Sequence, residues 1–127
     1  MGYRMAANLR RALPPSTSLV VNDIDKNACE RFKYEFTEYG PIEIAATAKE
    51  TASQASTILS IVTGPAHVRA VYLDEETGVI NAPPDADRLI LECSTIDLTT
   101  TRFVHGKLSA AGMGVYIDAP VSVRLAP

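Results

Sequence analysis

The sequence has no tryptophan, few aromatic residues and no long apolar run. A membrane-spanning helix needs about 20 consecutive apolar residues, so we expect no span of that kind. The N-terminus also lacks the uninterrupted apolar segment of a secretory signal peptide. The net charge is −3 and the basic residues are scattered. Neutralising phosphates requires a basic face, and the sequence therefore argues against nucleic acid as a main partner.

Cysteine is scarce as well. Cys29 and Cys93 are the only two, and they form no CxxC motif. This pattern argues against a disulfide framework and predicts two reduced, small, buried side chains in an intracellular protein. We expect no metal site.

What is present is typical of one globular domain: 127 residues, of which 46% are apolar and 21% are charged. Short β-rich runs alternate with helical patterns. Strands are predicted at 18–22, 41–45, 56–64, 88–94 and 114–122, and helices at 5–13, 26–37, 48–55, 65–73 and 96–111. Thr47 and Thr95 are the expected caps of the third and fifth helices, and 74–87 is expected to be a polar loop. The alternation predicts βαβ units and an α/β fold with a parallel sheet covered on both faces.

Gly2 precedes a helical run, as does the last glycine of a dinucleotide-binding turn. The amides at the N-terminus of such a helix point at the phosphates of the ligand. A tolerated glycine near a chain end is the alternative, and Gly2 alone does not decide between them.

Asp23 ends the next predicted strand, 21 residues after Gly2. The acidic residue that binds the adenosine ribose lies roughly 20 residues beyond the glycine fingerprint. An aspartate there favours NAD, because its charge repels the 2′-phosphate of NADP. The alternative is a solvated turn in which Asp25 caps the next helix.

Two later strand ends carry small polar residues, Thr63 in one and Ser94 with Thr95 in the other. Ligands of open parallel sheets bind outside the carboxyl ends of the strands. Hydroxyls and amides at these ends can hold a ribose or a nicotinamide amide, although helix capping explains Thr95 equally well.

Taken together, these stretches resemble the β-hydroxyacid dehydrogenase family, which includes 3-hydroxyisobutyrate dehydrogenase and the related N-terminal domain of 6-phosphogluconate dehydrogenase. The motifs that carry the resemblance are "MGYRMAANL", "CSTIDLTTTR" and "DAPVSVR", in that order along the whole chain. The resemblance implies a Rossmann-type doubly wound parallel sheet and a nicotinamide cofactor. NAD is favoured by Asp23, and NADP stays open because the family uses both.

Site residues follow from the resemblance position by position. It implies that Met1 and Gly2 end the pyrophosphate turn and that Asp23 binds the adenosine ribose. Val62 and Thr63 match strand-end positions that touch the cofactor. The remaining matches are His67 near the nicotinamide side, where a surface histidine is the alternative, Thr95 at the nicotinamide portion, and Ser122 in the substrate-binding segment.

The chain also departs from the family pattern. The family begins with a strand and GxGxMG, of which only "MG" stands here, so we expect a sheet without its first, central strand. That arrangement leaves a cleft with unpaired backbone groups and apolar surface. Val123 and Arg124 replace the glycines of the substrate segment. No lysine matches the catalytic lysine of the family's helical half, and Lys49 and Lys107 are expected at the surface.

The family reaction is oxidation of a β-hydroxyacid with hydride transfer to the nicotinamide. We predict a partial NAD(P)-binding domain over 1–127, inactive alone, with a small hydroxyacid substrate only in the intact family and self-association through exposed apolar surface. We expect a cytoplasmic or mitochondrial location, the latter because some relatives are imported. A non-catalytic interaction protein that retains a degenerate Rossmann fold is the main alternative. A receiver-like phosphoacceptor domain is disfavoured, because the strand ends offer no suitable aspartate and lysine pair.

Overall fold

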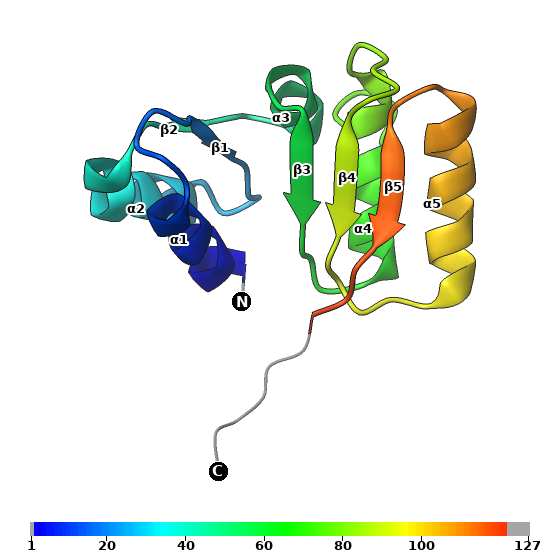
Figure 1. The fold of residues 1–127 in the computed structure, drawn as a ribbon. Coiled ribbons are helices and arrows are strands. Elements are labelled where there is room, and N and C mark those ends of the chain that lie inside the picture. The colour runs from blue at the N-terminus through cyan, green and yellow to red at the C-terminus, as the bar shows by residue number, and fades with distance from the viewer. Residues whose placement is uncertain (1, 122–127) are drawn as a thin grey trace.

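The computed structural model describes residues 2–121, which form five parallel strands and five α-helices (Figure 1). The strands are β1 (Leu19–Val21), β2 (Ile42–Ile44), β3 (Thr57–Ser60), β4 (Leu89–Glu92) and β5 (Val115–Asp118). The helices are α1 (Gly2–Ala12), α2 (Lys26–Phe36), α3 (Ala48–Gln54), α4 (Pro65–Leu73) and α5 (Leu98–Ala110), with short 3₁₀ turns η1 (Thr37–Tyr39) and η2 (Val79–Asn81). None of these helices is long and apolar enough to cross a membrane.

The strands form two separate parallel sheets. One has the order β1-β2 and the other the order β3-β4-β5. A common Rossmann order is 3-2-1-4-5-6. If β1 to β5 are counted as the second to sixth strands of that order, the two observed sheets correspond to 3-2 and 4-5-6. The position of the first strand, between them, is open. The predicted Rossmann-type fold without its first strand is therefore confirmed.

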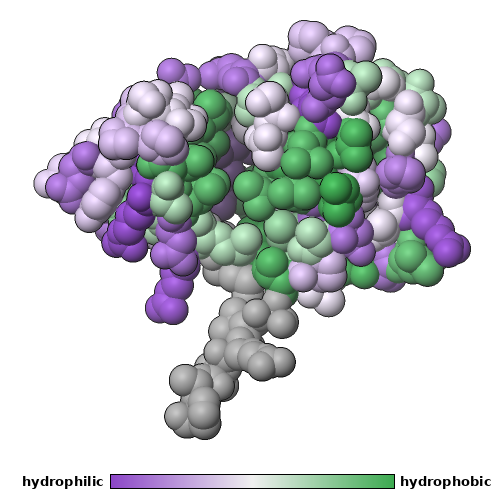
Figure 2. All heavy atoms as spheres, viewed as in Figure 1, coloured by the Kyte–Doolittle hydropathy of each residue, from purple (hydrophilic) through white to green (hydrophobic). Residues whose placement is uncertain are grey.

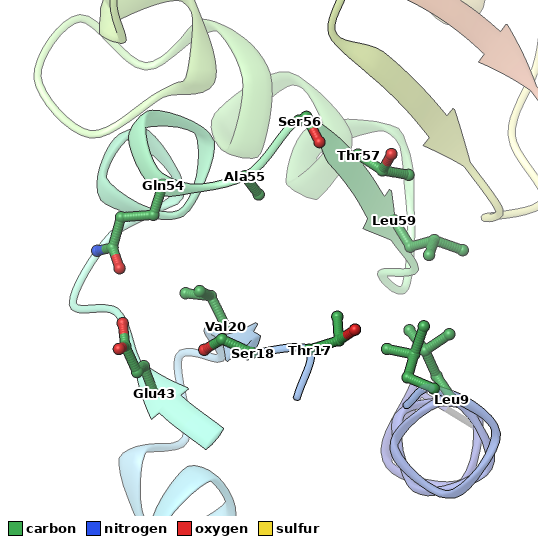
Figure 3. A pocket seen from close by; sticks show the side chains of 11 residues that line it. Leu9, Thr17, Ser18, Val20, Glu43, Gln54, Ala55, Ser56, Thr57 and Leu59 are labelled. Carbon is green, nitrogen blue, oxygen red and sulfur yellow. The ribbon is translucent and has the colours of Figure 1, made fainter. Parts of the chain in front are cut away.

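A cleft of about 690 Å³ lies between the two sheets (Figure 3). Figure 2 shows apolar side chains on both sides of this hollow. Within residues 2–121, β1 and β3 pair with no strand on the side that faces the cleft. Their backbone groups there are open to pairing, as expected from the sequence. The lining residues are Leu9, Leu13, Thr17, Ser18, Val20, Glu43, Gln54, Ala55, Ser56, Thr57 and Leu59.

The cleft separates two lobes with separate cores. We call residues 2–45 the N-terminal lobe and residues 46–121 the C-terminal lobe. The larger core belongs to the C-terminal lobe and includes Ile90, Val104 and Leu108, all fully buried. The smaller core consists of four buried residues, Ala7, Phe32, Phe36 and Ile42.

A buried arginine ties the N-terminal lobe together. The Arg10 guanidinium donates to the carbonyl oxygens of Thr17 (2.5 Å), Pro41 (2.9 Å) and Pro14 (2.8 Å). Gly40 makes room for it: its φ of +147° disfavours other residues, and a Cβ there would lie 2.6 Å from the guanidinium. One side chain thus connects α1, the loop before β1 and the start of β2.

The predicted elements exist, with two corrections. Thr95 is not the cap of α5. Asp97 is, because its carboxylate accepts the Thr100 amide at 2.8 Å and the Thr100 hydroxyl at 2.9 Å. The segment after α4 was predicted to be a polar loop, but its residues Val79 and Ala82 are buried in the larger core. The Thr47 cap of α3 is confirmed, with the Glu50 amide at 3.1 Å.

Candidate functional site

A second pocket, of about 350 Å³, lies where β3 and β4 end and α1 begins. It brings together Gly2, Val62, Thr63 and Thr95, four residues singled out from the sequence. The carboxyl end of a parallel sheet, next to a switch in strand order, is the usual ligand site of such folds. We call this the strand-end pocket. Its lining residues are Gly2, Ile61, Val62, Thr63, Cys93, Ser94, Thr95 and Val121.

The N-terminus of α1 forms one wall of the strand-end pocket. A Cβ on Gly2 would lie 3.0 Å from Cγ2 of Ile61, which is tighter than ordinary van der Waals contact. The glycine therefore lets α1 approach the end of β3 closely, as the packing glycine of a dinucleotide turn does. The first turn of α1 holds no acidic residue and includes Arg4. The amides of this turn and the positive end of the helix dipole suit an anionic group.

The opposite wall consists of backbone and hydroxyl groups. The Val62 amide donates to Oγ of Ser94 at 2.7 Å, which joins the ends of β3 and β4. The Thr63 hydroxyl lies 2.7 Å from Nδ1 of His67, and both residues are exposed. Thr95 is exposed as well and lines the pocket without capping α5. These groups can donate to or accept from a polar ligand.

Asp23 lies just beyond the end of β1 and does not line the strand-end pocket. It is exposed, and its Oδ1 accepts the Asp25 amide at 2.8 Å. The Asp25 carboxylate in turn caps α2 by accepting the amides of Asn27 and Ala28. The turn proposed as the alternative is therefore present. It leaves Asp23 at a strand end, where its second carboxylate oxygen can face a ligand.

Both cysteines are buried and free, as predicted. Burial raises the pKa of the Cys93 thiol, and the neighbouring Glu92 raises it further. Burial and then Asp23 raise the pKa of the Cys29 thiol in the same direction. A raised thiol pKa leaves little thiolate at neutral pH, so neither cysteine is suited to act as a nucleophile.

Several described residues named from the sequence lie outside the strand-end pocket, and Ile61, Cys93 and Val121 line it without having been named as cofactor contacts. Met1 and Ser122 lie outside the described residues. Lys49 and Lys107 are exposed, as expected. Residues 2–121 contain no group of three or more histidine, cysteine, aspartate or glutamate residues arranged to hold a metal ion.

Glu92 is the residue that sequence reasoning missed. It is fully buried directly behind the strand-end pocket, where its Oε1 accepts the Ser94 amide at 2.7 Å. A signal was available, because a glutamate in the otherwise apolar run "LILEC" is unusual in a buried strand.

Comparison with known proteins agrees with this geometry. Residues 1–123 match the family described as the NAD binding domain of 6-phosphogluconate dehydrogenase. NAD-dependent L-serine dehydrogenase of Pseudomonas aeruginosa is 33% identical over 96% of this chain. A probable mitochondrial 3-hydroxyisobutyrate dehydrogenase of Arabidopsis thaliana is 28% identical, again over 96% of the chain. The chain spans 37% and 35% of the lengths of these two relatives.

Solved structures give the same result. Mycobacterium tuberculosis 3-hydroxyisobutyrate dehydrogenase, solved with L-serine, superposes with a TM-score of 0.76 and 27% identity. That match covers 97% of this chain and 38% of the other. The Salmonella typhimurium 3-hydroxyisobutyrate dehydrogenase gives a TM-score of 0.69 and 26% identity, over 93% and 37% of the two chains. The chain thus belongs to the family of NAD-binding domains typified by that of 6-phosphogluconate dehydrogenase.

Proposed function

We propose that this chain is the cofactor-binding part of a 3-hydroxyisobutyrate dehydrogenase-like oxidoreductase, and that it binds NAD in preference to NADP. One observation carries the proposal: Gly2 at the start of α1 meets Val62, Thr63 and Thr95 in one pocket at the strand ends. The packing of Gly2 on Ile61 and the acid-free first turn of α1 suit a pyrophosphate.

The proposed roles divide the cofactor between the two lobes. The N-terminal amides of α1 bind the pyrophosphate, and Met1 with Gly2 ends its turn. Asp23, beyond β1, accepts from the adenosine ribose. Val62, Thr63 and Thr95, just beyond the ends of β3 and β4, bind the nicotinamide half together with His67 of α4. Ser122 is proposed to contact the substrate.

In the intact enzyme, the bound nicotinamide supplies hydride transfer with a β-hydroxyacid. The residues of this chain bind and orient the cofactor, and no acid or base among them is assigned to the chemical step. We therefore propose that 1–127 is a partial domain, inactive alone. A cytoplasmic or mitochondrial location is part of the proposal, in keeping with two relatives that are named as mitochondrial.

The test is a titration of the 127-residue chain with NADH and with NADPH, followed by nicotinamide fluorescence. We expect saturable binding that is tighter for NADH. Asp23→Ala is expected to weaken NADH binding about tenfold or more and to reduce the preference over NADPH, because a hydrogen bond to a charged group is lost.

Asp85→Ala is the matched control. Asp85 accepts the Asp87 amide at 3.0 Å in the same kind of turn, but it precedes β4 and so lies away from the carboxyl ends of the strands. We expect it to leave both affinities unchanged. A chain that melts cooperatively yet binds neither dinucleotide would contradict the proposal and would favour a non-catalytic interaction protein. Equal weakening by the two variants would contradict the role of Asp23.

A further inference from the structure

A fully buried acidic side chain lies behind the strand-end pocket. Glu92 is the last residue of β4 and is paired with Ser60, the last residue of β3. The Ser60 hydroxyl donates to Oε2 of Glu92 and is itself in contact with the Tyr72 hydroxyl. In the described part of the chain, the hydrogen-bond partners of the Glu92 carboxylate are a hydroxyl and an amide group rather than cations. Burying such a group is costly unless its oxygen atoms are satisfied, and here both are.

The other carboxyl oxygen extends the network towards the pocket. Oε1 of Glu92 accepts the Ser94 amide at 2.7 Å, and the Ser94 hydroxyl accepts the Val62 amide at 2.7 Å. The last ladder bond between these strands runs from the Cys93 amide to the Ser60 carbonyl. Beyond that bond the segment after β3 leaves the sheet, and the Ser94 hydroxyl supplies the partner that its Val62 amide would otherwise lack.

The network therefore runs from the core to the pocket wall. Tyr72 and Ser60 support Glu92, Glu92 fixes the Ser94 backbone, and Ser94 fixes Val62. Burial raises the pKa of the Tyr72 hydroxyl well above its usual range, so that this group stays protonated as a hydrogen-bonding partner. Val62 and Ser94 both line the pocket, whereas Glu92 lies behind it.

We propose that Glu92 and Ser94 are positioning residues that hold the segment 61–63 in place for the nicotinamide half of the cofactor. This inference rests on the proposed dinucleotide function and extends it to Glu92, which precedes the motif "CSTIDLTTTR", and to Ser94 within that motif. Because the network joins β3 to β4 on the C-terminal lobe, it acts on that half of the ligand and not on the adenosine half near Asp23.

The experiment compares Ser94→Ala, Glu92→Leu, Glu92→Gln and Ser53→Ala with the unmodified chain. Ser94→Ala removes the acceptor of the Val62 amide. Glu92→Gln keeps an acceptor for the Ser94 amide, and its NH₂ can donate to Ser60, whose hydroxyl then turns towards Tyr72. Ser53, an exposed residue of α3 that bonds Lys49, is the matched control.

Three quantities are measured: the Kd for NADH, the Kd for ADP-ribose, and the hydrogen exchange rate of the Val62 amide. For Ser94→Ala we expect NADH binding to weaken about three- to tenfold, because one hydrogen bond is lost. ADP-ribose binding should stay within about twofold, and Val62 exchange should accelerate by a similar three- to tenfold factor. Ser53→Ala should match the unmodified chain in all three. Glu92→Leu removes the acceptor of the Ser94 amide, and it should weaken NADH binding and accelerate Val62 exchange in the same direction as Ser94→Ala. Glu92→Gln keeps that acceptor and should restore both values, whereas unchanged Val62 exchange in Glu92→Leu would overturn the role of Glu92.

Equal weakening of NADH and ADP-ribose in Ser94→Ala would show a general structural effect and overturn the proposal. Unchanged Val62 exchange would overturn it as well, because the amide would not be held by Ser94. If the unmodified chain binds no dinucleotide, the proposed function fails and the cofactor role fails with it. The exchange rate then still reports whether Ser94 holds the segment.

Discussion

The two lobes differ in how completely they are supported. The C-terminal lobe has three strands and a core of eleven buried residues, with β4 paired on both sides. The N-terminal lobe has two strands, four buried core residues and no buried residue in β1. Small cores contribute less burial for each ordered residue. We infer that the larger core stabilises the C-terminal lobe, whereas the stability of the N-terminal lobe depends on a few side-chain contacts.

The contacts themselves are of different kinds. The N-terminal lobe relies on aromatic packing, with the rings of Phe32 and Phe36 5.0 Å apart and Tyr3 edge-on to Phe32 at 5.3 Å. It also relies on the three carbonyl bonds of Arg10. Arg88 plays a similar part in the C-terminal lobe, where it donates to the carbonyls of Met113 and Pro83. The adenosine half of the cofactor is thus proposed to bind the less stable N-terminal lobe, and the nicotinamide half the more stable C-terminal lobe.

The largest effect is expected from Arg10→Met. The change leaves three carbonyl groups without their partner and costs about 3 kcal/mol or more. Amide hydrogen exchange should rise across residues 2–45 and change little across residues 56–118. Arg11→Met is the control, since Arg11 is exposed and stacks over Phe36. An equal rise in both lobes would show that the lobes unfold as one unit.

A matched pair of core truncations compares the lobes directly. Ile90 and Ile42 are both buried, in the larger and the smaller core. Ile90→Ala should lower the free energy of unfolding of the C-terminal lobe by about 2–5 kcal/mol. Ile42→Ala should open only the N-terminal lobe. Denaturant unfolding with lobe-resolved exchange measures both, and global unfolding by Ile42→Ala would contradict the comparison.

The cleft between the lobes is the expected route of self-association. Leu59 on β3 lines it and is 45% exposed, and Ile117 on β5 is 43% exposed outside it. Leu59→Lys should shift the sedimentation of the chain towards monomer at a given concentration, because an open edge next to apolar surface promotes pairing. Ile117→Lys should do so less. A larger shift with Ile117→Lys than with Leu59→Lys would place the self-association contact on β5 instead of the cleft.

The smallest effect is expected at the start of α5. Hydrogen bonds from Thr100 lower the pKa of Asp97 below its usual value. A lowered folded-state pKa contributes stability that is present above the unfolded pKa and is lost as pH falls through the folded pKa. The Tm should therefore fall slightly more between pH 5 and pH 2 in the unmodified chain than in Asp97→Asn. An identical pH profile would contradict the cap.

Most helices and strands could be predicted, because the spacing of apolar residues and the turn-forming residues at strand ends are local features of the sequence. The run at β4 and the Pro65 start of α4 are examples. The α5 cap was misplaced because Thr95 and Asp97 are both good caps, and only the geometry beyond β4 decides between them. The burial of Val79 depends on how η2 packs against α3 and α4, which no local pattern encodes.

The candidate site was predictable to a similar degree. Gly2, Val62, Thr63 and Thr95 follow from motif and strand-end position, and they meet in one pocket. The role of Glu92 was not predictable, because its partner Ser60 comes from the neighbouring strand β3, whose register with β4 is a tertiary property.

The most direct test of the strand-end pocket as a dinucleotide site is an amide chemical-shift map of the chain titrated with NADH. We expect shifts at Gly2, Val62, Thr63 and Thr95, which line the strand-end pocket, and at Asp23. Shifts confined to Leu9, Val20 and Leu59 would place the ligand in the cleft between the lobes instead. That result, or a folded chain whose spectrum does not change, would contradict the assignment of the strand-end pocket as the dinucleotide site.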